Sequence, residues 1–197
     1  MHTRRRREAH EDAAAEAIRL DGPDRGVGLD ARGTMSGSKA LFLDRDGVIN
    51  LDHGYVGRVE DFEFVEGILD FIAEAQRKGY RPIVVTNQSG IGRGYYGRED
   101  FERVTEWMVA RMRERGIAID RSQIFFCPHV PGEGCGCRKP EPGMFREAAE
   151  RFGIDLSNSW MIGDKPSDIE AARSAGVGHT LRIETNRPIK REVLDEL

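Results

Sequence analysis

Two carboxylates that stand two residues apart, Asp44 and Asp46, are the first feature of this sequence that could do chemistry. Acids this close repel each other unless a cation or a shared proton relieves the repulsion. Mg²⁺ prefers oxygen ligands and keeps several waters, so two carboxylates and a backbone carbonyl suit it. A hydroxyl, a lysine and a third acid follow later in the chain, at Thr86, Lys139 and Asp164. Together these residue types indicate phosphoryl transfer.

Each of these side chains has a plausible role in that reaction. Asp44 can attack phosphorus as a carboxylate nucleophile and form an aspartyl phosphate. Asp46 can protonate the leaving oxygen and then activate water. Thr86 and Lys139 can hold the remaining phosphoryl oxygens and offset the charge that grows in the transition state.

Taken singly, the same residues have ordinary structural explanations. An Asp-x-Asp pair after a strand is often a turn or a cap, and the segment 86–90 has the composition of a turn. Lys139 alone is an ordinary surface lysine. Asp168 can be an acid favoured by the helix dipole, or it can orient Lys139 or the waters of a metal ion. The catalytic interpretation therefore depends on the fold bringing these residues together.

From residue 39 onward the chain alternates apolar strands with amphipathic helices. Short apolar runs predict strands at 40–43, 82–85, 124–126, 160–162 and 180–183. Apolar residues at helical spacing predict helices at 66–78, 98–115, 142–152 and 166–175. This alternation indicates an α/β fold of the Rossmann-like, doubly wound type, with a mostly parallel five-stranded sheet. Ligands in such folds bind beyond the carboxyl ends of the strands, where the acids, Thr86 and Lys139 are expected.

At these positions the sequence resembles the phosphatases of the haloacid dehalogenase superfamily. The resemblance covers about residues 39–185 and rests on the segments 43–47, 86–87, 139 and 163–165 with Asp168. It implies that Asp44 is the nucleophile, that Asp46 is the general acid and base, and that Thr86 and Lys139 bind the phosphoryl group. It also implies Mg²⁺ on Asp44, the Asp46 carbonyl and Asp164, with Lys165 beside that set. No long insertion follows the first motif or the second strand, so we expect an open site without a large cap domain.

All three cysteines lie in one short loop together with a histidine. The four residues are Cys127, His129, Cys135 and Cys137. Three thiolates and one imidazole form a standard structural zinc site, so the spacing predicts a zinc-bound loop. The alternatives are unpaired cysteines or a catalytic Cys/His pair, and the second has no evident oxyanion or orienting partner. Zinc would fix the loop that delivers Arg138 and Lys139, so its role would be positional.

The same loop narrows the resemblance to a branch that contains heptose-bisphosphate and histidinol-phosphate phosphatases. The segments 46–50, 52–56, 86–91, 105–108 and 138–144 are more similar to the heptose enzymes. The resemblance implies substrate contacts from Asp52, His53, Gly54, Tyr55, Asn87, Gln88, Ser89 and Arg138. His53 and Tyr55 could instead simply pack the loop. The five-residue gap between His129 and Cys135 matches the histidinol branch, so both substrates and the anomer of the heptose stay open.

Length and composition set the remaining expectations. The 197 residues, 39% of them hydrophobic, suit one domain at 39–197 preceded by a mobile N-terminal extension at 1–38. The net charge of −4 argues against nucleic-acid binding, and no apolar run is long enough to span a membrane. We expect a cytoplasmic monomer that acts on a small phosphorylated sugar. A zinc-stabilised binding module without activity is the alternative from another class, and the intact set of acids argues against it.

Overall fold

The computed structural model describes residues 28–29 and 35–197. Most of the predicted extension at 1–38 lies outside these residues. Two short strands, β1 (Gly28–Leu29) and β2 (Met35–Ser36), pair in antiparallel fashion ahead of the main body. Ser38 then exchanges backbone hydrogen bonds with the loop after helix α4 (Gly143–Phe152): its N–H donates to Gly153 O at 3.0 Å and its carbonyl accepts from Asp155 N at 3.0 Å. Ser38, a residue of the predicted extension, is therefore hydrogen-bonded to the main body.

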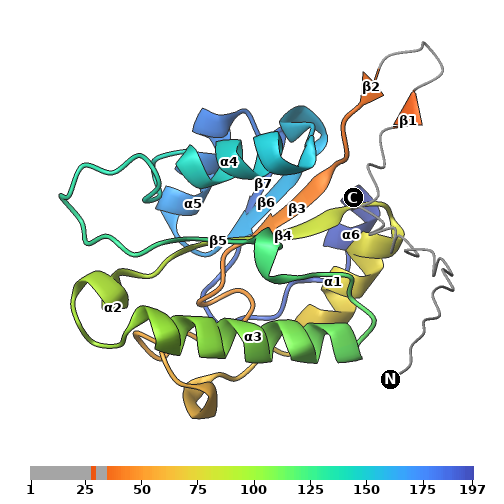
Figure 1. Ribbon diagram of the computed structural model, residues 1–197. Helices are drawn as coiled ribbons and strands as arrows, with labels where there is room; N and C mark the ends of the chain where they lie inside the picture. The colour runs from red at the N-terminus through yellow and green to blue at the C-terminus, as the bar shows by residue number, and fades with distance from the viewer. Residues whose placement is uncertain (1–27, 30–34) are drawn as a thin grey trace, which may run out of the picture.

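A five-stranded sheet in the order β5-β4-β3-β6-β7 forms the centre of the molecule, and all its neighbouring strands are parallel (Figure 1). The strands are β3 (Ala40–Leu43), β4 (Arg81–Asn87), β5 (Ile124–Cys127), β6 (Trp160–Gly163) and β7 (His179–Arg182). The predicted α/β class and the five parallel strands are confirmed. The central strand β3 is fully buried along its length, as its uninterrupted apolar run predicts.

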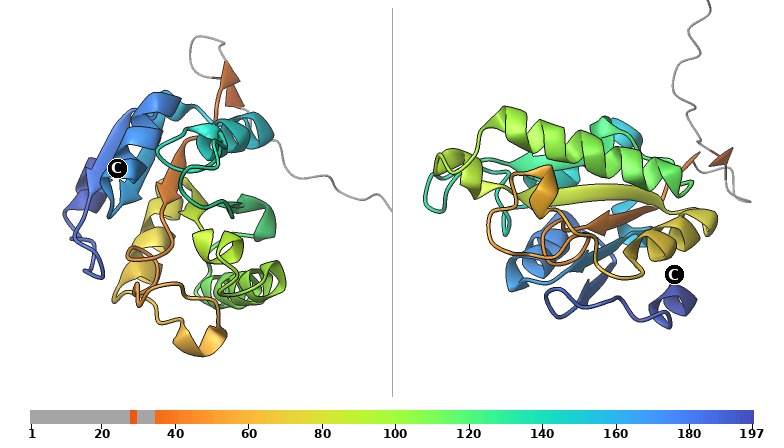
Figure 2. Two further views of the ribbon diagram at one scale, coloured as in Figure 1. Left: turned by 90° about the vertical axis from the view of Figure 1, so that its left-hand side faces the viewer. Right: turned by 90° about the horizontal axis from the view of Figure 1, so that it is seen from below.

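Helices cover both faces of the sheet (Figure 2). They are α1 (Ile68–Arg77), α2 (Ser89–Gly92), α3 (Arg98–Glu114), α4 (Gly143–Phe152), α5 (Pro166–Ala175) and α6 (Val193–Glu196), with 3-10 turns η1 (Val59–Asp61), η2 (Arg121–Gln123) and η3 (Leu156–Asn158). Alternate residues of β3 enter opposite cores. Leu41 and Leu43 pack with α1 and α3, whereas Ala40 and Phe42 pack with α4 and α5. This two-sided core holds the strand ends in fixed positions at one edge of the sheet.

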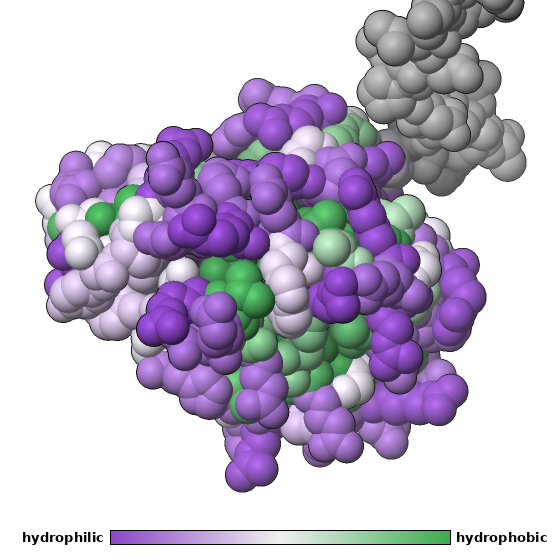
Figure 3. All heavy atoms as spheres, turned by 60° about the horizontal axis from the view of Figure 1, so that its bottom comes forward, coloured by the Kyte–Doolittle hydropathy of each residue, from purple (hydrophilic) through white to green (hydrophobic). Residues whose placement is uncertain are grey.

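The face shown in Figure 3 is mostly hydrophilic, with apolar side chains grouped in one area. Within residues 28–29 and 35–197, no helix combines the length and the apolar character that a membrane span requires.

Candidate active site

A buried ion-pair group lies at the carboxyl ends of the central strands. Asp44 directly follows β3, and its Oδ1 accepts a hydrogen bond from Lys139 Nζ at 2.9 Å. The same ammonium lies 2.7 Å from Asp168 Oδ1 and donates to the Val85 carbonyl at 2.7 Å. The side chains of Asp44, Lys139 and Asp168 are 6%, 1% and 1% exposed. The predicted nucleophile and the predicted phosphoryl-binding lysine are thus in direct contact, and Asp44 is the most exposed of the three side chains.

The charges of this group explain how its members titrate. Burial raises the pKa of Asp44 to about 7, although Lys139 opposes that rise. Burial also acts to lower the pKa of Lys139, but the carboxylates of Asp44 and Asp168 outweigh it and hold that pKa above its ordinary value. Lys139 therefore stays protonated. The group carries one positive and two negative charges when Asp44 is ionised, so an added cation would stabilise it.

Asp164 completes a set of oxygens that fits a divalent cation. It follows β6, and side-chain oxygens of Asp44, Asp164 and Asp168 lie within 4.8 Å of one another. Asp164 Oδ1 is buried without a hydrogen-bond partner, whereas Oδ2 accepts from Thr185 Oγ1 at 2.8 Å. Both oxygens of Asp168 are occupied, one by Lys139 and the other by the backbone N–H of Lys165 at 2.9 Å. Asp44 and Asp164 are therefore the carboxylates that fit Mg²⁺, and Asp168 orients Lys139.

Gly47 makes room for this arrangement. Its φ of +89° lies in the left-handed region, and a Cβ at this position would stand 2.5 Å from Asp164 Oδ2. A side chain there would be strained and would also displace the carboxylate. The left-handed backbone and the close approach of Asp164 explain why glycine follows the Asp-x-Asp pair.

The carboxylate of Asp46 is fixed by three neighbours. Oδ1 accepts from Arg45 Nη2 at 2.8 Å and from Asn50 Nδ2 at 3.1 Å, and Oδ2 accepts from Gln88 Nε2 at 2.8 Å. Burial disfavours the charged form, but Arg45 and the two amides outweigh burial and hold the pKa of Asp46 below its ordinary value. Gln88 Nε2 also donates to Thr86 Oγ1 at 2.8 Å. Because this Oγ1 accepts from Gln88, its own hydrogen can be donated to a phosphoryl oxygen.

A second cluster brings together the four residues of the predicted zinc site. Cys127 Sγ lies 3.4 Å from His129 Nδ1 and 3.6 Å from Cys135 Sγ, and Cys137 Sγ lies 3.5 Å from His129 Nδ1. All four ligand atoms lie within 4.8 Å of one another. Sulfur ligands about 2.3 Å from a tetrahedral Zn²⁺ would stand about 3.8 Å apart, so the spacing and the donor set both fit that ion.

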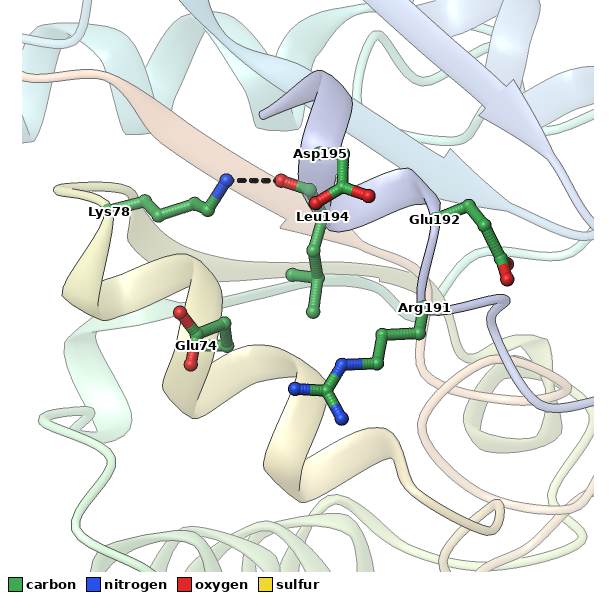
Figure 4. Close-up of a pocket in the computed structure, with 6 residues that line it drawn as sticks. All are labelled: Glu74, Lys78, Arg191, Glu192, Leu194 and Asp195. Atoms are coloured by element: carbon green, nitrogen blue, oxygen red, sulfur yellow. Dashed lines mark hydrogen bonds between the residues drawn. The ribbon is translucent and has the colours of Figure 1, made fainter.

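The cavity shown in Figure 4 lies elsewhere. It has a volume of about 230 Å³ and is lined by Glu74, Lys78, Arg191, Glu192, Leu194 and Asp195. Lys78 Nζ donates to the Leu194 carbonyl across it. Because Lys78 precedes the first residue of β4, Arg81, this cavity is at the amino end of the strands. The predicted catalytic groups lie at the carboxyl end of the strands.

Comparisons with known proteins agree with this geometry. A family model described as HAD-hydrolase-like matches residues 136–186. The chain is 46% identical over 160 residues to D-glycero-beta-D-manno-heptose-1,7-bisphosphate 7-phosphatase of Vibrio cholerae, an alignment that covers 78% of this chain and 85% of that protein. The protein of the same name from Escherichia coli K12 is 44% identical over 160 residues, with 78% and 83% covered.

A crystal structure is also similar. The D,D-heptose 1,7-bisphosphate phosphatase from B. bronchiseptica, complexed with magnesium and phosphate, superposes with a TM-score of 0.72 at 30% identity, covering 81% of this chain and 99% of that one. The chain belongs to the HAD-like phosphatases. The resemblance predicted from the sequence is thus confirmed, and so is the assignment to the phosphoric monoester hydrolases.

In this HAD-like phosphatase, several residues that were predicted to contact the substrate form hydrogen bonds with other parts of the protein. Asn87 and the Lys139 backbone exchange two hydrogen bonds of 3.0 Å, and Arg138 Nη1 donates to the His129 carbonyl at 2.9 Å. Gln88 is buried and holds Asp46 and Thr86. Asn87 and Gln88 thus hold predicted catalytic groups in position. Ser89 begins the short helix α2, next to them.

The loop at 52–55 contains three exposed residues and one, Asp52, that is partly buried. His53, Gly54 and Tyr55 are exposed, and the half-exposed ring of Tyr55 contacts Tyr95 edge-on with 4.7 Å between centroids. Asp52 Oδ2 instead lies 3.3 Å from Lys165 Nζ. Burial acts to lower the pKa of Lys165, but the surrounding carboxylates raise it to about 12. A protonated ammonium cannot ligate a cation, so the side chain of Lys165 is not a metal ligand and forms an ion pair with Asp52.

Sequence reasoning missed Thr185, Asn186 and Tyr96. Thr185 holds Asp164, while Asn186 Oδ1 accepts from Asp52 N at 2.6 Å and Asn186 N donates to the Gly47 carbonyl at 2.9 Å. The sequence did carry a signal for Thr185 and Asn186, because both are polar residues that follow the fifth strand of the sheet within a few positions. Tyr96 is separated from β4 by a helix and a turn, and its spacing gave no such signal.

Proposed function

We propose that this chain is a Mg²⁺-dependent phosphatase that removes the 7-phosphate of D-glycero-β-D-manno-heptose 1,7-bisphosphate, in the synthesis of nucleotide-activated heptose. One observation carries the proposal. Relatives that are 42–46% identical over most of this chain are named as phosphatases of this substrate and this anomer. The contact between Asp44 and Lys139 beside Asp164 supports it, because it supplies the groups that phosphoryl transfer requires.

The first half of the reaction uses the carboxylates as nucleophile and acid. The ionised Asp44 attacks phosphorus, so that a bond forms between its oxygen and phosphorus while the bond to the sugar oxygen breaks. Asp46 first takes up a proton from solvent, because the negative charge of the bound phosphate opposes the effect of its hydrogen bonds, and it then gives this proton to the departing sugar oxygen. Lys139, held by Asp168 and the Val85 carbonyl, and the hydroxyl of Thr86 donate to the phosphoryl oxygens.

The second half regenerates the enzyme. Asp46, now ionised, takes a proton from water, whose oxygen attacks the phosphorus of the aspartyl phosphate. The bond between Asp44 and phosphorus breaks, and inorganic phosphate leaves. The hydrogen bonds from Arg45, Asn50 and Gln88 favour the ionised form of Asp46 that this step needs.

Two metal ions belong to the proposal. Asp44, Asp164 and the Asp46 carbonyl would hold Mg²⁺, which when bound supplies positive charge near the transferred phosphoryl group. The residues Cys127, His129, Cys135 and Cys137 would hold Zn²⁺ in a structural role. Three free cysteines in one cluster suit a reducing compartment, and we propose a cytoplasmic enzyme that acts as a monomer.

Histidinol phosphate is the second candidate substrate. The five-residue gap between His129 and Cys135 favours it, because that loop length is the one expected of the histidinol branch. The chemistry at phosphorus would be the same, so the two candidates differ only in the leaving group.

Phosphate release from three substrates tests the assignment. The purified protein with Mg²⁺ is given the β anomer of the heptose bisphosphate, its α anomer and histidinol phosphate at equal concentrations. We expect the highest kcat/KM with the β anomer, and ³¹P NMR should show that the phosphate at position 1 remains. Equal or faster turnover of histidinol phosphate would contradict the heptose assignment.

A further inference from the structure

Tyr96 occupies a slot that two glycines leave open. A Cβ at Gly57 would stand 2.5 Å from ring atoms of Tyr96, and a Cβ at Gly90 would stand 2.2 Å from another. Distances this short exclude any larger residue at either glycine while the ring is present. Gly57 precedes η1 and Gly90 lies in α2, so two separate segments provide the slot. The position of the ring is therefore fixed from both sides.

The hydroxyl of this ring is two hydrogen bonds away from Asp46. Tyr96 OH donates to Gln88 Oε1 at 2.6 Å, and Gln88 Nε2 donates to Asp46 Oδ2 at 2.8 Å. Gln88 is 2% exposed, so water has little access to its amide. The three side chains come from a turn before α3, the end of β4 and the end of β3.

The direction of these bonds determines the orientation of the Gln88 amide. A carboxylate only accepts hydrogen bonds, so the NH₂ group must face Asp46 and the carbonyl oxygen must face away. Tyr96 donates to that oxygen and stabilises this orientation. Burial raises the pKa of Tyr96 to about 12, so the hydroxyl keeps its proton over the working range of the enzyme.

We propose that Tyr96 is a positioning residue that acts through Gln88 to hold the side chain of Asp46 at the place from which, once protonated, it serves the leaving oxygen. The inference rests on the proposed function only in the role that it gives Asp46 as general acid. Without the hydroxyl, the amide can rotate and place its oxygen against the carboxylate, which would push Asp46 out of position. Tyr96 itself touches no reacting atom.

Tyr96→Phe is the direct test because it keeps the ring in its slot and removes only the donor. Two substrates are compared: the heptose bisphosphate, whose sugar oxygen needs a proton to leave, and p-nitrophenyl phosphate, whose phenolate leaves without one. We expect kcat/KM to fall three- to tenfold with the sugar substrate and less than twofold with p-nitrophenyl phosphate. The melting temperature should stay within 1–2 °C of the wild type, roughly the effect of one hydrogen bond or less.

Tyr95→Phe is the matched control, since it removes a hydroxyl from the neighbouring exposed ring. It should leave both rates unchanged. In a Gln88→Ala background, where the connection to Asp46 is already absent, Tyr96→Phe should have no further effect on the rate with the sugar substrate. Equal losses with both substrates, or a full additional loss in the Gln88→Ala background, would overturn the positioning role.

The same assays separate this inference from the substrate assignment. A wild-type protein that fails to hydrolyse heptose bisphosphate would contradict the proposed function. The inference about Tyr96 would then be judged on phenyl phosphate, whose phenolate is the poorer leaving group, against p-nitrophenyl phosphate. A larger loss with phenyl phosphate would support it, and equal losses would refute it.

Discussion

At the scale of single residues, Asp44, Lys139 and Asp168 form a buried group with one positive and two negative charges. The excess negative charge would repel a phosphate dianion unless a cation accompanies it. The unpartnered Oδ1 of Asp164 indicates where that cation would fit, beside the predicted nucleophile Asp44. Lys139 would bind phosphoryl oxygens, and a divalent ion held by Asp44 and Asp164 would supply the positive charge that balances the acids.

Asp44→Asn should abolish phosphate release, by about three orders of magnitude or more, because the amide cannot form the covalent intermediate. The fold should survive, since the amide has the same shape and Lys139 keeps Asp168 and the Val85 carbonyl as partners. Phosphate release and a thermal melt measure the two effects. Activity within tenfold of the wild type would show that Asp44 is not the nucleophile.

Thr185→Val should raise the Mg²⁺ concentration needed for half-maximal activity by roughly tenfold, since Asp164 loses the hydroxyl that orients it. Titration of activity with Mg²⁺ measures the change. Thr185→Ser is the matched control, because it keeps the hydroxyl and should keep the Mg²⁺ requirement close to that of the wild type. An unchanged requirement in the valine variant would place the cation away from Asp164.

At the scale of elements, apolar periodicity was sufficient for the sheet and its major helices. The predicted strands and helices match β3 to β7, α1, α3, α4 and α5 with ends that differ by a few residues. The short α2 and α6 were not predicted, because four residues carry too little periodicity. Strand ends also located Asp44, Thr86 and Asp164 correctly. Spacing does not encode side-chain direction, so it could not show that Asn87 bonds to the Lys139 backbone and that Gln88 bonds to Asp46 and Thr86. Substrate contact by Asn87 and Gln88 stays a prediction.

One ion pair between elements should give a pH-dependent stability. Arg121 in η2 donates two hydrogen bonds to the carboxylate of Glu102 in α3, of 2.5 and 2.8 Å. The hydrogen bond from Arg121 lowers the pKa of Glu102. Because the folded pKa lies below the unfolded one, the stabilisation is fully present above the ordinary glutamate pKa of 4.5 and is lost as the pH falls through the folded value.

Glu102→Gln should therefore lower the melting temperature by about 1–3 °C at pH 7, a small effect because both side chains are about a third exposed. The difference from the wild type should shrink as the pH falls below 4.5. Glu106→Gln, on the same helix but in no ion pair within residues 35–197, should show no such trend. A difference between Glu102→Gln and wild type that stays constant from pH 7 to pH 3 would contradict the assignment.

At the scale of the whole molecule, the cysteine cluster and the active site share one loop. The segment between β5 and α4 carries the cluster residues Cys135 and Cys137 and then, without a break, Arg138 and Lys139. Arg138 is bonded to the His129 carbonyl, and the Lys139 backbone is bonded to Asn87 after β4. A cation in the cluster would thus fix both ends of the segment that delivers Lys139 to Asp44.

Removal of zinc should consequently affect stability and catalysis together. Treatment with 1,10-phenanthroline in the presence of excess Mg²⁺ should lower the melting temperature by several degrees, because ion binding contributes to the folding of the loop. It should also lower kcat, because Lys139 is no longer held, and added Zn²⁺ should restore both whereas added Mg²⁺ should restore neither. Treatment with the non-chelating 1,7-phenanthroline is the control. A metal-free protein, verified by elemental analysis, with an unchanged melting curve and full activity would show that the cluster needs no ion to place Lys139.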